Sequence, residues 1–239
     1  GWVDAGSAGA DNIEEMVAVA RSAPQPARIL LNIGRGGVIP EGDTADISMA
    51  NVELAKAAIA SNLDYVVGVK ARLTSGVTAN DIVVIRRAQE VASYFNLPLM
   101  IHMGQSESSM ASLVTELKPG DVVTHMYAPP PNAIINNDGR IFPEILEARR
   151  RGIWFDVANG RVDHLRWDTF DAIMAEGFWP DTISTDGFST SRSAPGVRNY
   201  PNIMSKFFNF VSYFSYCVCV HVSKLCYHSI AIYYFCIFI

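Results

Sequence analysis

Seven short apolar runs, separated by stretches of helical length, recur at regular intervals along this chain of 239 residues. Most of the runs are rich in Val, Ile and Leu, which is typical of strands buried on both faces of a parallel sheet. The predicted strands are residues 2–5, 28–33, 65–72, 98–103, 122–126, 153–157 and 182–185. Strands that alternate with crossover helices predict a parallel α/β sheet, and seven units at this spacing favour a (β/α)8 barrel over an open sheet.

Two of the intervening stretches carry clear helix signals. Residues 46–62 place apolar side chains at helical spacing, and we expect the following stripe to be buried: Ile47, Val52, Leu54, Ala58 and Ile59. Residues 78–96 begin with Thr78, whose hydroxyl can cap the start of a helix.

Four polar residues lie at the carboxyl ends of the apolar runs. They are Lys70 in VVGVKAR, His102 in LPLMIHMG, His125 in DVVTHMY and Asp186 in TISTDG. In a (β/α)8 barrel that end of the sheet is where catalytic groups gather. The pattern therefore predicts a metal-dependent hydrolase.

The chemistry of each residue type supports this hypothesis, although each has an ordinary alternative. A buried lysine loses hydration, so its pKa falls, and its neutral amine can take up CO2 to form a carbamate, which is an oxygen ligand. The alternative is that the Lys70 side chain reaches solvent from the rim of the barrel. Neutral imidazole is the commonest zinc ligand, whereas an isolated strand-end histidine is often a core residue. Asp186 can bind a metal and accept the proton of an attacking water, or simply form a turn before Gly187.

Two further residues are weaker candidates. Arg72 lies two positions beyond Lys70, so it shares a face of the strand and could bind a substrate carboxylate; equally, it could pair with a neighbouring acid. His164 lies among charged residues in GRVDHLRWDTF, and we expect it to be exposed and not to be a ligand. The glycine-rich segments GSAGAD and GRGG match neither a P-loop nor a dinucleotide-binding motif.

Composition narrows the class of protein. The net charge of −5 argues against a nucleic-acid partner. No cysteine precedes Cys217. Residues 1–216 therefore contain neither a disulfide framework nor a thiolate metal site, and any metal ligands there must be nitrogen and oxygen donors. The first residues resemble an interior strand and turn, without an initiating Met or a basic leader, so we expect the chain to begin within a domain.

The composition changes after Met204. The remainder has no acidic residue, only Lys206 and Lys224 as fixed cations, and all four cysteines. We therefore predict a barrel domain over residues 1–206 and an aromatic, Cys-rich tail over 207–239. The tail has two interpretations. It could be a membrane anchor, although its uncharged stretches are short for a bilayer span. We favour the other interpretation, in which it is non-native sequence translated outside the true coding frame.

Several segments together resemble the amidohydrolase superfamily, specifically its dihydroorotase-like, metal-dependent deacetylase branch. They are VDAGSAGADN, GVKAR, IHMG, VVTHMY, NNDGRIFPEILEARRRGIWFDVANG, GFWPDTISTDG and MSKF, and they occur in family order from Trp2 to about Lys206. The resemblance implies a TIM-like barrel with a binuclear Zn2+ centre. It implies that Lys70 is the carboxylated bridging lysine, that His102 and His125 are ligands, and that Asp186 is both a ligand and the general base. Arg72 remains the candidate for substrate binding.

This chain also differs from the pattern of the family that it resembles. Family members carry a His-x-His pair on the first barrel strand, and we expect this chain to start after it. The predicted fold is thus a partial TIM (β/α)8 barrel lacking its first strand, with an unrelated C-terminal tail and at most one metal site retained.

The function predicted from these observations is hydrolysis of an amide or ester bond by a metal-activated hydroxide, impaired by loss of the His-x-His ligands. The implied partners are small-molecule amides or esters such as cyclic amides, N-acyl amino acids and acetylated hydroxy acids. The alternatives are a non-catalytic barrel fragment from a mispredicted gene model, or a membrane-tethered barrel protein if the tail is genuine. We predict a cytoplasmic location without a nucleic-acid partner; the sequence leaves substrate identity, metal identity and oligomeric state open.

Overall fold

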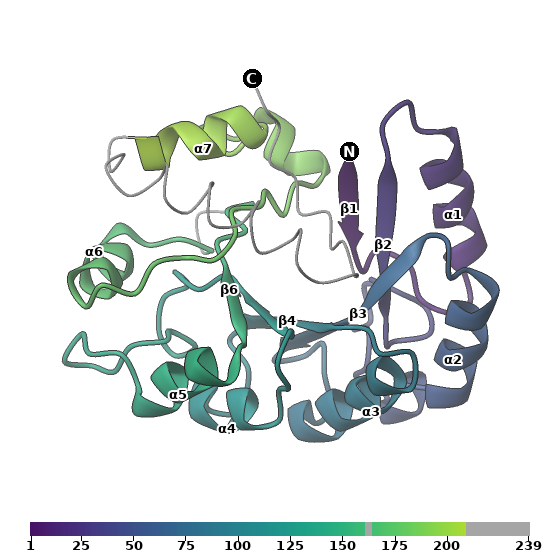
Figure 1. Cartoon of the computed structure of the whole chain (residues 1–239), viewed down its shortest axis with the longest axis horizontal. Helices are drawn as coiled ribbons and strands as arrows, with labels where there is room; N and C mark the ends of the chain where they lie inside the picture. The colour runs from purple at the N-terminus through teal and green to yellow at the C-terminus, as the bar shows by residue number, and fades with distance from the viewer. Residues whose placement is uncertain (161–163, 209–239) are drawn as a thin grey trace.

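The computed structural model describes residues 1–160 and 164–208 of the chain. Within them, six parallel strands form one sheet, and their order across the sheet is their order in the sequence. The strands are β1 (Trp2–Ala5), β2 (Ala27–Asn32), β3 (Val66–Thr74), β4 (Leu99–Gly104), β5 (Val122–Thr124) and β6 (Trp154–Asp156). Figure 1 shows that the sheet curls, with helices around its outside. The fold is a curled half of a TIM-like barrel, so the predicted fold class is confirmed.

A helix occupies each connection from β1 to β6, and two more follow β6. The α-helices are α1 (Ile13–Ser22), α2 (Val52–Ser61), α3 (Asp81–Tyr94), α4 (Met110–Thr115), α5 (Pro143–Arg151), α6 (Trp167–Ala175) and α7 (Tyr200–Phe208), with short 3-10 turns η1 (Ile47–Met49) and η2 (Ser189–Ser193). This alternation gives the parallel pairing, because a strand can return beside its predecessor in the same direction only through a crossover.

Apolar residues cover both faces of the sheet, which explains why the strands appear as near-continuous apolar runs. Along β2, Ile29 and Leu31 belong to the main core between sheet and helices, whereas Leu30 points to the opposite, inner face. There Leu30 packs in a second cluster with Met100 and Val122. Side chains alternate across a strand, so the next inward positions toward the carboxyl ends form the next layer of the barrel interior.

That next layer is polar. The strand register pairs Asn32 with Lys70, and a second row pairs Arg72 with His102, His102 with Thr124, and Thr124 with Asp156. These residues are inward-facing positions toward the carboxyl ends of their strands. The fold therefore gathers on one surface several of the polar residues that the sequence distributes along the chain.

The seventh predicted strand, residues 182–185, is not a full strand. Thr182 forms one isolated parallel bridge with Asp156, and backbone hydrogen bonds join Val157 N to Thr182 O (3.1 Å) and Asn159 N to Ser184 O (3.3 Å). The segment thus runs beside β6, but its ladder does not extend beyond this short stretch. Its hydroxyl side chains instead bond to the side chain of Asp156, as described below.

Two details of the predicted helices were wrong. Asn80, not Thr78, caps α3, because the Asn80 side chain accepts a hydrogen bond from Val83 N. The Thr78 hydroxyl instead donates to the Arg72 carbonyl at 2.7 Å. In α2 the buried residues include Ala58 and Ile59 as expected, whereas Leu54 is exposed.

Helix α7 closes the described part of the chain. Its Phe207 is buried, with ring centroids 6.4 Å from Tyr127 and 5.9 Å from Phe170. The domain boundary at residue 206 stays a prediction, and the tail from residue 209 onward lies outside the described residues. Among the helices of residues 1–160 and 164–208, none is long and apolar enough to span a membrane.

Candidate metal centre

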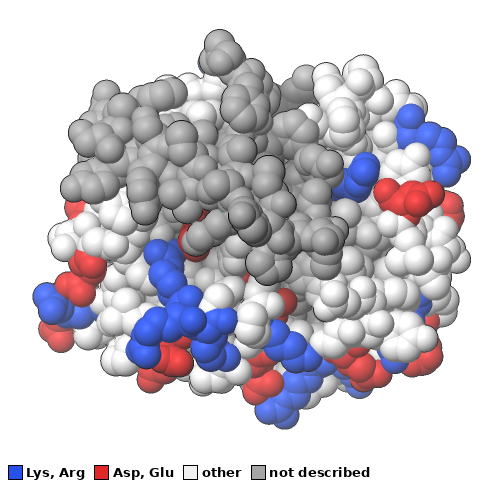
Figure 2. All heavy atoms as spheres, viewed as in Figure 1, with Lys and Arg blue, Asp and Glu red and all other residues white. Residues whose placement is uncertain are grey.

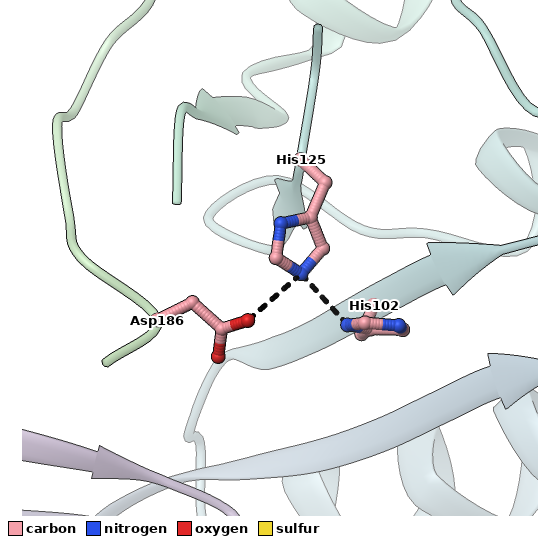
Figure 3. Close-up of side chains that lie close together, drawn as sticks. All are labelled: His102, His125 and Asp186. Carbon is pink, nitrogen blue, oxygen red and sulfur yellow. Dashed lines mark hydrogen bonds and ion pairs between the residues drawn. The ribbon is translucent and has the colours of Figure 1, made fainter. Parts of the chain in front are cut away.

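Three predicted ligands meet at the carboxyl ends of the strands. His102 lies on β4, His125 directly follows β5, and Asp186 follows the segment that runs beside β6. Their ligand atoms all lie within 4.8 Å of one another. His125 Nε2 is 2.7 Å from His102 Nδ1 and 3.7 Å from Asp186 Oδ2, and Figure 3 shows both contacts.

The His125 ring is held in one orientation by its backbone neighbour. His125 Nδ1 lies 2.8 Å from the carbonyl oxygen of Ala158, which can only accept, so Nδ1 carries a proton and a neutral ring presents the Nε2 lone pair to the site. Burial, reinforced by the neighbouring His102, His164 and Lys70, lowers the pKa of His125 well below its usual value. His125 is therefore a neutral imidazole suited to metal binding.

The backbone around this site is strained. His125, Ala158 and Asp186 have positive φ angles of 68°, 41° and 43°. For residues other than glycine this left-handed region costs on the order of 1–3 kcal/mol each, and it persists only where the surrounding structure imposes it. The strain is thus concentrated at two candidate ligands and at the residue whose carbonyl orients one of them.

Asp186 is positioned by close backbone packing. A Cβ built on Gly160 would lie 2.0 Å from Asp186 O, so only glycine permits this approach of the two segments. The Asp186 side chain remains 34% exposed. It can therefore face both a bound ion and an incoming substrate.

Asp156 is a buried carboxylate that the sequence reasoning did not single out. It is fully buried and accepts hydrogen bonds from Thr124 Oγ1 (2.8 Å), Thr182 Oγ1 (2.5 Å) and Ser184 Oγ (2.7 Å). Burial raises the pKa of Asp156, and these three hydrogen bonds oppose that rise. Thr124 precedes His125 directly, so Asp156 ties the strand that carries His125 to the segment that leads to Asp186.

A signal for Asp156 was present in the sequence. It lies at the end of the apolar run GIWFDVA, the same position that singled out the other site residues.

Lys70 is buried on the inner face of β3, only 6% exposed. Burial lowers its pKa to about 8, although the nearby carboxylates of Asp186, Asp156 and Asp4 act in the opposite direction. At pH 7 about one amine in ten would then be neutral. This is the form that can take up CO2, so the surroundings fit the predicted carbamate.

The stem of Lys70 packs against Gly6. A Cβ on Gly6 would lie 2.5 Å from Lys70 Cγ, and Gly6 has a φ of +90°. Both the close approach and the backbone conformation require glycine at this position.

Arg72 pairs with an acid. Its guanidinium binds both oxygens of Asp43, with Nη2 2.6 Å from Oδ1 and Nε 3.0 Å from Oδ2. Asp43 is buried and also accepts from Asn32 Nδ2 at 2.9 Å. The sequence left both roles open for Arg72; the structure shows the ion pair, and the role in substrate binding stays a prediction.

His164 corrects an expectation of the sequence analysis. It is buried, not exposed, at 9% of its residue area. Its ring centroid is 3.9 Å from that of His125, and its Nδ1 is 3.2 Å from Asp186 Oδ2. The charged neighbours in sequence suggested a solvated position, but the backbone at this point pairs with the segment after β5.

The arrangement of donors fits a divalent metal ion. A tetrahedral ion with metal–nitrogen distances of about 2.0–2.1 Å places two of its donor atoms about 3.3 Å apart. The separations of 2.7 and 3.7 Å around His125 Nε2 lie on either side of that value. Metal binding would replace the hydrogen that His102 and His125 share, with small movements of the side chains.

Comparisons with known proteins agree with this fold. The chain is 30% identical over 207 residues to a deacetylase of Enterococcus faecalis, covering 85% of this chain and 56% of the relative. It is 27% identical over 211 residues to a deacetylase of Agrobacterium fabrum, covering 85% and 51%. No family model matches the chain.

Solved structures with the same fold include two enzymes. A crystal structure of an adenine deaminase superposes with a TM-score of 0.75 at 30% identity, covering 80% of this chain and 52% of that one. A dihydroorotase superposes with a TM-score of 0.73 at 25% identity, covering 81% and 52%. Both are members of the amidohydrolase superfamily, so the predicted resemblance is confirmed. The chain spans about half the length of the curated relatives it matches.

Proposed function

We propose that this chain carries the metal site of an amidohydrolase-type hydrolase that acts on amide or ester bonds of small molecules. The observation that carries the proposal is the convergence of His102, His125 and Asp186 beside the buried Lys70 at the carboxyl ends of a curled parallel sheet. Relatives named as deacetylases and neighbours named as a deaminase and a dihydroorotase support this reaction class.

Each residue has a distinct role in the proposal. His102, His125 and Asp186 would hold a divalent ion, with the Lys70 carbamate as a further oxygen donor. Such an ion, when bound, supplies an activated water and polarises the carbonyl to be attacked. Asp186, still partly exposed, accepts the proton of the water and returns it to the leaving group. Arg72 would contact an acidic group on the substrate.

The donor set of imidazole nitrogens and carboxyl oxygens accepts several divalent metals. Zn2+ is the ion that we propose, in line with the family resemblance. The proposed substrates are the classes given by that resemblance: cyclic amides, N-acyl amino acids and acetylated hydroxy acids.

The test is metal content and hydrolysis on the purified full chain, produced in medium with zinc and bicarbonate. We expect about one metal per chain and release of acetate from N-acetyl amino acids or opening of a cyclic amide. Asp186→Asn should slow hydrolysis by about 10²-fold or more, as expected for loss of a general base. Asp171→Asn, which changes an exposed carboxylate on α6, is the matched control and should leave both readouts unchanged.

The same experiment separates the catalytic proposal from its alternative. A non-catalytic barrel that binds metal is the second candidate. Metal binding without hydrolysis of any tested class would favour that candidate. A folded chain that binds no metal would refute both.

A further inference from the structure

A third imidazole enters the candidate metal centre from an unexpected segment. The ring centroid of His164 is 3.9 Å from that of His125 and 5.8 Å from that of His102. His164 Nδ1 also lies 3.2 Å from Asp186 Oδ2. The resemblance to the amidohydrolase superfamily implied no role for this position.

The backbone holds His164 beside the end of β5. Leu165 forms a parallel bridge with Tyr127, and Arg166 N donates to Tyr127 O at 3.1 Å. Tyr127 is two residues after His125, so these contacts fix His164 next to the ligand-bearing turn. Its position is therefore set by main-chain pairing as well as by side-chain packing.

The donor atoms form a continuous series. His102 Nδ1, His125 Nε2, Asp186 Oδ2 and His164 Nδ1 are separated in turn by 2.7, 3.7 and 3.2 Å. Two donors on one tetrahedral ion lie about 3.3 Å apart, so each separation is close to the value that a shared ion requires. The ligand atoms of His102, His125 and Asp186 all lie within 4.8 Å of one another, and His164 Nδ1 lies 3.2 Å from one of them, Asp186 Oδ2.

We propose that His164 is a fourth protein ligand of the ion held by His102, His125 and Asp186. The site would then offer three imidazoles and one carboxylate, a set suited to Zn2+ or Co2+. This inference rests on the proposed function, because it requires that the site bind a metal at all.

The test is a Co2+ titration of the full chain after removal of metal with a chelator. Co2+ reports both affinity and coordination, because its visible absorption is strong in four-coordinate sites and weak in six-coordinate ones. We expect His164→Ala to weaken Co2+ binding at least tenfold and to lower the absorption per bound ion. X-ray absorption of the zinc-loaded protein should count one imidazole fewer in the variant than in the wild type.

A second measurement separates a ligand from a residue that only supports the fold. Added imidazole should restore part of the absorption and affinity of His164→Ala, because it can occupy the vacated position on the ion. Asn62→Ala is the matched control: it removes a buried polar side chain before the amino end of β3, so any loss of stability there should leave the Co2+ spectrum unchanged.

The outcomes distinguish this inference from the proposed function. If the wild-type chain binds no Co2+ or Zn2+, the proposed function fails. If the wild type binds metal and His164→Ala, folded by circular dichroism, shows the same affinity, spectrum and imidazole count, then only the role of His164 is refuted.

Discussion

Replacing Lys70 by methionine removes an ammonium group that the inner face of the sheet buries, while keeping the length of its apolar stem. Burial lowers the pKa of Lys70 from its ordinary value of 10.5 to about 8. The stability of the wild-type protein should therefore depend on pH in a range where the methionine variant has lost that dependence.

The sign follows from proton binding in the two states. Below about pH 8, Lys70 is charged in both the folded and the unfolded chain, so the cost of burying the charge is fully present. Between about pH 8 and 10.5 the folded protein has released this proton and the unfolded chain has not. Because the unfolded state then binds more protons, the free energy of unfolding rises with pH, by about 3 kcal/mol in all.

The assay is urea unfolding followed by circular dichroism at pH 7.5, 9 and 10.5, with chelator and without CO2 so that the amine stays free. Other groups titrate over this range, so the informative quantity is the difference in unfolding free energy between wild type and Lys70→Met. That difference should change by about 3 kcal/mol in favour of the wild type as pH rises.

Lys56→Met provides the control. A hydrogen bond with Glu90 raises the pKa of Lys56 above its usual value, so Lys56 stays charged in both the folded and the unfolded chain over most of the range from pH 8 to 10.5, and its loss should not reproduce the rise in stability. If the difference in unfolding free energy between wild type and Lys70→Met stays constant within about 1 kcal/mol over this pH range, Lys70 keeps an ordinary pKa and is hydrated. The reasoning that makes Lys70 a carbamate-forming residue would then be wrong.

Three further predictions concern the frame of the site. Asp156→Ala leaves the three hydroxyl partners of a fully buried carboxylate without their acceptor, so urea unfolding should show a loss of about 3–6 kcal/mol in the free energy of unfolding. Co2+ titration of the same variant should show metal binding weakened by about 10–100-fold. Asp156→Asn keeps an oxygen acceptor and should lose less on both measures. Gly6→Ala places a Cβ against the Lys70 stem at a φ of +90° and should lower the unfolding free energy by about 1–3 kcal/mol; an unchanged value would mean that the close packing is absent. Arg72→Ala leaves the buried Asp43 carboxylate without its ion-pair partner and should cost about 2–4 kcal/mol, whereas a variant of full stability with a raised KM would assign Arg72 to the substrate alone.

The sequence predicted the architecture well because the signals for it are local. Apolar runs without polar alternation predicted strands buried on both faces, and all six strands of the sheet coincide with predicted runs. The position of Lys70, His102 and His125 at the ends of those runs predicted that they would share the carboxyl edge of the sheet. Parallel strands place their carboxyl ends together, so this inference needed no knowledge of distant contacts.

The errors came from residues whose surroundings are set by distant segments. His164 has charged neighbours in sequence, yet it is buried because Leu165 and Arg166 pair with Tyr127. Thr78 has the right chemistry for a helix cap, but its hydroxyl binds the Arg72 carbonyl instead. In each case the residue type was compatible with the predicted role, and a tertiary contact assigned it another.

The sequence by itself determined the parallel α/β fold and the face and end of the sheet on which the candidate ligands lie, because periodicity encodes the direction of a side chain along its own element. Only the tertiary structure decided which groups meet: Arg72 with Asp43, Asp156 with three hydroxyls, and His164 with His125 and Asp186. The physical reason is that these contacts join segments of the chain far apart in sequence, and their partners are chosen by the curvature and register of the sheet, which no local pattern records.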